Sequence, residues 1–323
     1  MTPLRLGTRG SRLALWQARA VADALRTAGG PASDIVTIAT SGDRQPEATL
    51  SDLGGKRVFV KEIEQALLAG TIDLAVHSAK DLPADLPDGL VVGGVLPRED
   101  PHDALVLPEG RTPASFLCTV QSLPQGVRVG TSSIRRAAQL TRLLPTAKFS
   151  DIRGNLETRL RKLDAGASDV LVLAVAGLRR LGYAHRVSAT IPAEACLPSP
   201  GQGAIAVEVR EDDATTRAAV DAISDRAAFV ALTAERALVA GLGGGCHMPV
   251  GALALLGDGV LSVRGIVTSL DGGAAIRCAV TGSPDAAVDL GRTLADQLLE
   301  AGAADVLGAA RAELALGDQR AAT

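Results

Sequence analysis

The segment "GLGGGCHMPVG", residues 241–251, places a cysteine directly after three glycines. A thiolate is a strong nucleophile, and glycine lets the backbone pass close to a bulky group. Either the glycines form a tight turn and Cys246 is incidental, or a large group must reach its sulfur. The other cysteines form no C-x-x-C pair and the histidines are scattered, so we expect neither a disulfide framework nor a metal site.

Arginines form a second pattern that could carry chemistry. In "VGTSSIRRAAQL", Thr131–Ser133 can cap a helix that begins near Ile134, which places Arg135 and Arg136 in its first turn. Positive charge at this end of a helix is unfavourable by about 0.3–1 kcal/mol per side chain. A bound anion would explain the arrangement, and two solvated arginines on an exposed turn would explain it equally well.

More arginines lie where predicted strands meet helices: Arg9, Arg153, Arg159, Arg179 and Arg180. Ligands of open α/β sheets bind at the carboxyl ends of strands, and the guanidinium fork pairs bidentately with carboxylates. Each arginine alone is compatible with a surface position. Together they indicate a site for a multiply carboxylated or phosphorylated ligand.

The segment "IDLAVHSAKDLP" is an apolar run that ends in polar side chains. These side chains are His77, Ser78, Lys80 and Asp81. A carboxylate at the end of a buried strand could stabilise developing positive charge or transfer protons. A solvated ion pair between Lys80 and Asp81 is an equally good interpretation.

Elements that could position these residues follow an α/β pattern. Over the first two-thirds of the chain, short apolar runs alternate with helical patterns. In this part we expect strands at 4–8, 34–40, 72–79, 103–108, 127–130 and 203–210, with helices at 11–29 and 59–70. The last third predicts a small α-β-β-β-α module, with helices at 227–242 and 286–302 and strands at 250–256, 260–269 and 274–282. Residues 41–57 lack periodicity and predict a long loop.

The composition excludes several classes of protein. A chain of 323 residues with 47% hydrophobic and 21% charged residues suits two or three globular domains. The N-terminus has no signal-peptide pattern, and no apolar run is long enough to span a membrane. The net charge of −3 implies no bulk attraction to nucleic acid. Phosphate-binding glycine motifs do not fit the sequence, so a cytoplasmic enzyme or binding protein is expected.

Eight blocks resemble the porphobilinogen deaminase (hydroxymethylbilane synthase) family over nearly the full chain. In order they are "TRGSRLALWQ", "GGKRVFVKEIE", "DLAVHSAKDLP", "VGTSSIRRAAQL", "IRGNLETRLRKLD", "LAVAGLRRLG", "GQGAIAVE" and "GGGCHMPVGA". The resemblance implies an α/β fold of three domains. The first two would be like type 2 periplasmic binding proteins with a cleft between them, and the third a small α-β-β-β-α module. Domain 1 would comprise 1–103 and 201–222, domain 2 would comprise 104–200, and domain 3 would comprise 225–323.

The resemblance also implies an activity and a cofactor. A dipyrromethane would be bound to Cys246 through a thioether. Four porphobilinogen molecules would be condensed on it head to tail, with loss of ammonia and final release of hydroxymethylbilane. Asp81 matches the catalytic aspartate. A monomer that binds neither nucleic acid nor membrane is implied, and the alternative is a non-catalytic anion-binding protein on the same scaffold.

Further site residues follow from the resemblance alone. The cofactor would contact Ser78, Lys80, Asp81, Thr131, Ser133, Arg135, Arg136, Arg153 and Gly154. The substrate would contact Arg9, Ser11, Lys56, Lys61, Arg153, Arg159, Arg180 and Gln202. Three positions depart from the family pattern: Arg12, Arg57 and His247 stand where proline, glycine and glutamine are common.

Overall fold

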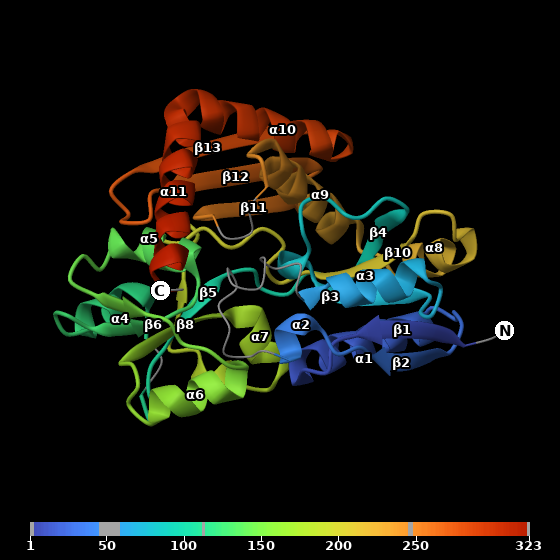
Figure 1. Cartoon of the computed structure of the whole chain (residues 1–323), viewed down its shortest axis with the longest axis horizontal. Coiled ribbons are helices and arrows are strands. Elements are labelled where there is room, and N and C mark those ends of the chain that lie inside the picture. The colour runs from blue at the N-terminus through green and yellow to red at the C-terminus, as the bar shows by residue number, and fades with distance from the viewer. Residues whose placement is uncertain (1–2, 45–58, 112–113, 245–247, 322–323) are drawn as a thin grey trace.

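The computed structural model describes residues 3–44, 59–111, 114–244 and 248–321, which form three sheets (Figure 1). The first sheet has the order β2-β1-β3-β10-β4. Its strands are β1 (Leu4–Thr8), β2 (Ser33–Thr37), β3 (Leu74–Ser78), β4 (Leu90–Val95) and β10 (Ile205–Arg210). Its helices are α1 (Arg12–Thr27), α2 (Ser41–Arg44), α3 (Lys61–Leu68) and α8 (Ala214–Asp221), with the 3-10 helix η2 (Ala79–Asp81) after β3.

The second sheet has the order β7-β6-β8-β5-β9. Its strands are β5 (Asp103–Val106), β6 (Arg128–Gly130), β7 (Lys148–Ser150), β8 (Val170–Ala174) and β9 (Ala189–Ile191). Its helices are α4 (Phe116–Ser122), α5 (Ile134–Thr141), α6 (Leu156–Asp164) and α7 (Val175–Arg180), followed by the 3-10 helix η3 (Ala184–Arg186). Two apolar clusters bury its faces, one under α6 and α7 and the other under α4 and α5.

Both five-stranded sheets have the same topology. Each contains three parallel strands, then one strand antiparallel to its two neighbours, then a fifth strand. The antiparallel strand is β10 in the first sheet and β5 in the second, and both follow segments that cross between the sheets. Two segments of the chain, 96–102 and 192–204, therefore connect the first two sheets.

The third sheet is antiparallel and has the order β11-β12-β13. Its strands are β11 (Val250–Gly257), β12 (Val260–Thr268) and β13 (Ala275–Gly282). Its helices are α9 (Arg226–Gly241), α10 (Ala287–Leu298) and α11 (Ala304–Ala321), together with the short helices η4 (Pro284–Ala286) and η5 (Leu299–Ala303). The helices bury one face of the sheet, while Leu253 and Ile266 on the other face pack against Ala193 and Leu197.

The predicted α/β fold is confirmed, with local differences, of which three are the largest. Residues 41–44, predicted as loop, form α2, whereas 45–57 lie outside the described residues. The strand predicted at 34–40 is shorter and ends at Thr37. The module does not end with its second helix. Gly302, with φ +98°, interrupts the helical backbone there, and a further helix, α11, follows at once.

Across the described ranges, none of the helices combines the length and the apolar character that crossing a bilayer requires.

Candidate active site

A cavity lies where the three sheets approach one another. It is lined by the η2 turn after β3, the amino-terminal turn of α5, the loop before β10, one face of α9 and the start of β11. Six of the predicted site residues line it: Lys80, Asp81, Ser133, Arg135, Arg136 and Gln202. Met248 and Val250 complete the wall, and Met248 stands two positions after Cys246 in the sequence.

Cys246 itself lies outside the described residues, as do Lys56, Arg57 and His247. The chain leading to it ends in two glycines with left-handed backbones, Gly243 at φ +82° and Gly244 at φ +66°. Such backbones favour glycine, which accounts for two of the three glycines before the cysteine.

Arg135 and Arg136 are buried, so the interpretation as solvated arginines is wrong. Both lie in the first turn of α5, where Ser133 accepts a hydrogen bond from the Arg136 N–H. Both guanidinium groups donate to the fully buried carboxylate of Asp103, the first residue of β5. Arg135 Nη2 lies 2.8 Å from Asp103 Oδ2, and Arg136 Nη2 and Nε lie 2.7 and 3.0 Å from Asp103 Oδ1.

This cluster has a surplus of positive charge. Burial by itself raises the pKa of Asp103, but the charges of Arg135 and Arg136 outweigh it and hold the pKa well below its usual range. Burial likewise opposes the charge of Arg135, yet Asp103 raises the pKa of that guanidinium. One carboxylate therefore balances two guanidinium groups, and the remaining charge faces the cavity. The anion predicted for this helix end is partly supplied by the protein itself.

Gln202 joins this cluster to the η2 turn. Its Nε2 donates to Asp103 Oδ1 and to the Pro101 carbonyl, both at 2.8 Å, and its Oε1 accepts from Lys80 Nζ at 3.3 Å. The flanking Gly201 has φ +73°, and a Cβ there would lie 2.8 Å from the Lys80 backbone nitrogen. Gln202 itself is almost completely buried in the cavity wall.

Asp81 ends the η2 turn and is half-buried at the cavity. The chain after it is held by Arg236 of α9, which donates to the carbonyls of Pro83 and Ala84, both at 2.7 Å. The module that carries Cys246 therefore contacts the segment that carries Asp81.

Glu235, the neighbour of Arg236 in α9, joins Arg98 and the loop before β10 to strand β11. Its fully buried carboxylate accepts from Arg98 Nη1 at 2.6 Å and Nη2 at 3.1 Å. It also accepts from the backbone N–H groups of Gly201 at 2.6 Å and Ala254 at 2.7 Å. Neither Glu235 nor Asp103 is among the site residues predicted from the sequence. The one signal that the sequence offers for each is an acidic residue within a largely apolar run.

Two family models match the chain. Residues 4–218 match "Porphobilinogen deaminase, dipyromethane cofactor binding domain", and residues 229–300 match "Porphobilinogen deaminase, C-terminal domain". The chain belongs to the porphobilinogen deaminase family.

Two porphobilinogen deaminases agree with this membership. A porphobilinogen deaminase of Syntrophus aciditrophicus is 46% identical over 301 residues, covering 93% of this chain and 96% of the relative. One of Desulforudis audaxviator is 47% identical over 309 residues, covering 95% and 97%. A solved periplasmic substrate-binding protein of an ABC transporter from Coxiella burnetii has 14% identity and a TM-score of 0.41, covering 68% of this chain and 91% of its own.

Several residues assigned by the porphobilinogen deaminase resemblance lie outside the lining of the cavity. They are Arg9, Ser11, Lys61, Ser78, Thr131, Arg153, Gly154, Arg159 and Arg180. Three of them gather before and within α6, where Arg159 Nε donates to the Gly154 carbonyl at 2.8 Å and Arg153 pairs with Asp151 at 2.5 Å. Burial lowers the pKa of Arg159, the charge of Arg136 lowers it further, and the charge of Asp151 acts in the opposite direction. Arg159 is therefore close enough to Arg136 for their positive charges to repel each other.

Arg180 has a separate position at the end of α7. Its Nη2 donates to the Gly203 carbonyl at 2.6 Å, and its guanidinium lies 5.6 Å from the ring centre of Trp16. Burial lowers the pKa of Arg180 to about 10. This side chain therefore contacts the residue that directly follows Gln202.

The remaining residues of the set have local partners. Ser11 caps α1 by accepting from the Ala14 N–H at 3.3 Å, and Ser78 exchanges hydrogen bonds with Gln17 at 2.8 and 3.1 Å. Three further residues complete the set. Thr131 accepts from the Ser133 N–H at 3.2 Å, Arg9 lies 4.2 Å from the ring centre of Phe59, and Lys61 is exposed at the start of α3.

Proposed function

We propose that the enzyme condenses four porphobilinogen molecules head to tail on a covalently bound dipyrromethane, with loss of ammonia at each addition and final release of hydroxymethylbilane. One observation carries the proposal: the cavity places the half-buried carboxylate of Asp81 beside Lys80, Arg135 and Arg136, next to the segment that bears Cys246. The family to which the chain belongs supports the same activity.

The residues at this cavity fit a dipyrromethane. Each of its two rings carries an acetate and a propionate, so that the group needs several cationic hydrogen-bond donors. Arg135 Nε is buried and has no hydrogen-bond partner among the described residues, although Nη1 and Nη2 of the same guanidinium donate to the Leu197 carbonyl and to Asp103. A buried donor of this kind is costly unless it is satisfied, and a ligand carboxylate would satisfy it.

Cys246 would hold this group through a thioether, with Lys80, Arg135 and Arg136 pairing its carboxylates. When bound, the group supplies a free pyrrole α-carbon on which the product is extended. Ser78, Thr131, Ser133, Arg153 and Gly154 complete the proposed cofactor contacts. Since guanidinium groups present planar pairs of donors, they hold each carboxylate in a defined orientation.

Asp81 would act on the reacting substrate. Porphobilinogen loses its aminomethyl nitrogen as ammonia, which requires a proton for the leaving amine and leaves positive charge on the substrate ring. A carboxylate at hydrogen-bonding distance from the pyrrole N–H stabilises that charge, and the same group can carry the proton.

The outer cations would bind the incoming carboxylates. We assign this role to Arg9, Ser11, Lys56, Lys61, Arg153, Arg159, Arg180 and Gln202. The repulsion between the positive charges of Arg136 and Arg159 supports it, since every added unit brings two negative charges that would relieve that repulsion.

We also propose that the three sheets define three domains. Domain 1 comprises 1–103 and 201–222, domain 2 comprises 104–200, and domain 3 comprises 225–323. The strand composition of each sheet supports this division. A cytoplasmic monomer that binds neither nucleic acid nor membrane completes the proposal.

Two substitutions test the mechanism. Asp81→Asn removes the charge while keeping the shape, and we expect kcat/KM for porphobilinogen to fall by roughly 10²–10⁴-fold. Asp85→Asn is the matched control, because Asp85 is exposed four residues further along the same segment, and its rate should stay at the wild-type level. A near-wild-type rate for Asp81→Asn would refute the proposed role.

The attachment site is tested by mass spectrometry of the intact purified protein. The wild type should carry the added mass of a dipyrromethane and give colour with an aldehyde reagent for pyrroles, and Cys246→Ala should lose both. An active protein with an unmodified thiol at Cys246 would contradict the proposal.

A further inference from the structure

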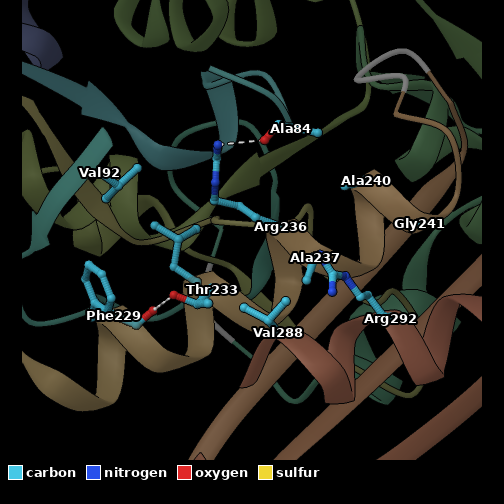
Figure 2. Close-up of a pocket in the computed structure, with 11 residues that line it drawn as sticks. Ala84, Val92, Phe229, Thr233, Arg236, Ala237, Ala240, Gly241, Val288 and Arg292 are labelled. Carbon is cyan, nitrogen blue, oxygen red and sulfur yellow. Dashed lines mark hydrogen bonds between the residues drawn. The ribbon is translucent and has the colours of Figure 1, made fainter. Parts of the chain in front are cut away.

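A second cavity lies between the first sheet and the helices of the third, and none of the predicted site residues that the structure describes lines it. Its volume is about 470 Å³, within the range of pockets that hold small ligands. Figure 2 shows its walls, which come from the turn at Ala84, from Val92 of β4, and from one face each of α9 and α10.

The lining of this cavity is amphipathic. Phe229, Leu232, Val92 and Val288 give it an apolar wall, and the charged residues in its lining, as far as the chain is described, are Arg236 and Arg292. No acidic side chain of the described residues lines it. Such a cavity can take an apolar body and one negative charge.

Arg236 and Arg292 differ in the hydrogen bonds and ion pairs that they form. Arg236 donates to two backbone carbonyls, as the dashed line to Ala84 in Figure 2 shows for one of them. Arg292 is exposed on α10, and within the described ranges it has neither an ion pair nor a hydrogen bond. Asp289 and Asp296 stand one turn to either side on the same described helix, but neither forms an ion pair with it. Arg292 is therefore the cation available to a ligand.

Both cavities share part of one wall. Ala84, Leu232 and Arg236 line this cavity and also the one that contains Asp81. Arg236 holds the 83–84 segment, which begins two residues after Asp81. A ligand that shifted Arg236 would therefore act on the position of the catalytic turn.

We propose that this second cavity binds small amphipathic monocarboxylates, with a ring or branched apolar body against Phe229 and the carboxylate paired with Arg292. A single available guanidinium favours a single negative charge, and the apolar wall favours a compact hydrophobic body. Through Arg236, occupancy of this cavity lowers turnover at the other.

Calorimetric titration of the purified holoenzyme with 2-naphthoate, and with the uncharged 2-naphthamide, tests the binding. We expect the wild type to bind the carboxylate at least tenfold more tightly than the amide. Arg292→Gln should abolish that preference, Arg292→Lys should retain part of it, and Ala240→Phe should weaken both ligands by filling the cavity. Arg226→Gln removes an exposed arginine of the same module outside the cavity and should change nothing.

Equal affinity for the two ligands, or carboxylate binding unchanged in both Arg292→Gln and Ala240→Phe, would overturn the site. The coupling rests on the proposed function and is measured separately, as porphobilinogen turnover with and without saturating 2-naphthoate. A decrease in the wild type that is absent in Arg292→Gln supports the coupling, and equal rates refute it. The binding experiment can therefore support the second cavity as a ligand site even if the proposed activity is refuted.

Discussion

Asp103 is the buried counter-charge of both Arg135 and Arg136. We consider its replacement by asparagine, which keeps the size of the side chain and removes its charge. The carboxylate is fully buried and accepts hydrogen bonds from Arg135, Arg136 and Gln202. The substitution Asp103→Asn would leave two guanidinium groups, only 5% and 7% exposed, without a counter-charge.

Breaking a buried ion pair by removing one partner costs about 3–5 kcal/mol, because the other charge stays buried. We expect a loss of that size in the free energy of unfolding at pH 7, measured by urea denaturation followed by circular dichroism. The control is Asp169→Asn, directly before strand β8 of the same sheet, which breaks the exposed pair with Arg128 and should cost far less.

The effect has a defined pH dependence. Because the pKa of Asp103 is lower in the folded state, its contribution is present above the unfolded pKa of about 3.9 and is lost as the pH falls towards the folded value. The difference in stability between wild type and Asp103→Asn should therefore be constant from pH 7 to about 5 and shrink below pH 4. A difference below about 1 kcal/mol at pH 7, or one unchanged down to pH 3, would refute the reasoning.

Other substitutions and labels test further parts of the structure. Glu235→Ala should lower the free energy of unfolding by about 3–5 kcal/mol in urea titrations, because Arg98 loses its buried partner; an unchanged midpoint would contradict this. In the native protein, Cys118 should react with a thiol reagent while Cys196 stays unlabelled until unfolding, because burial raises the pKa of Cys196 to about 12; equal labelling rates would count against it. Gly203→Ala should lower the melting temperature, since its φ is +86° and a Cβ would lie 2.2 Å from a backbone carbonyl.

Local signals made part of the site predictable. The strand that ends at Gly130 and the helix that begins at Ile134 lie where the sequence places them, because the cap at Ser133 is formed within three residues. Asn155 likewise caps α6 by accepting from the Thr158 N–H. Such contacts need no knowledge of the rest of the fold.

The buried partners could not be predicted in this way. Asp103 lies 32 and 33 residues from the arginines that it pairs with, and Glu235 lies 137 residues from Arg98. No periodicity or cap links such positions. The helix-end arginines therefore indicate an external anion when only the sequence is considered, and the internal carboxylate is found only once the strands lie beside one another.

The discontinuous first sheet has a consequence for how the chain is made. Its strand β10 (Ile205–Arg210) lies between β3 and β4, and it is synthesised more than 100 residues after them. All five strands of the second sheet fall between Asp103 and Ile191. On the ribosome, the second sheet is therefore the first that can be completed. Until β10 is synthesised, the edges of β3 and β4 that pair with it stay unpaired.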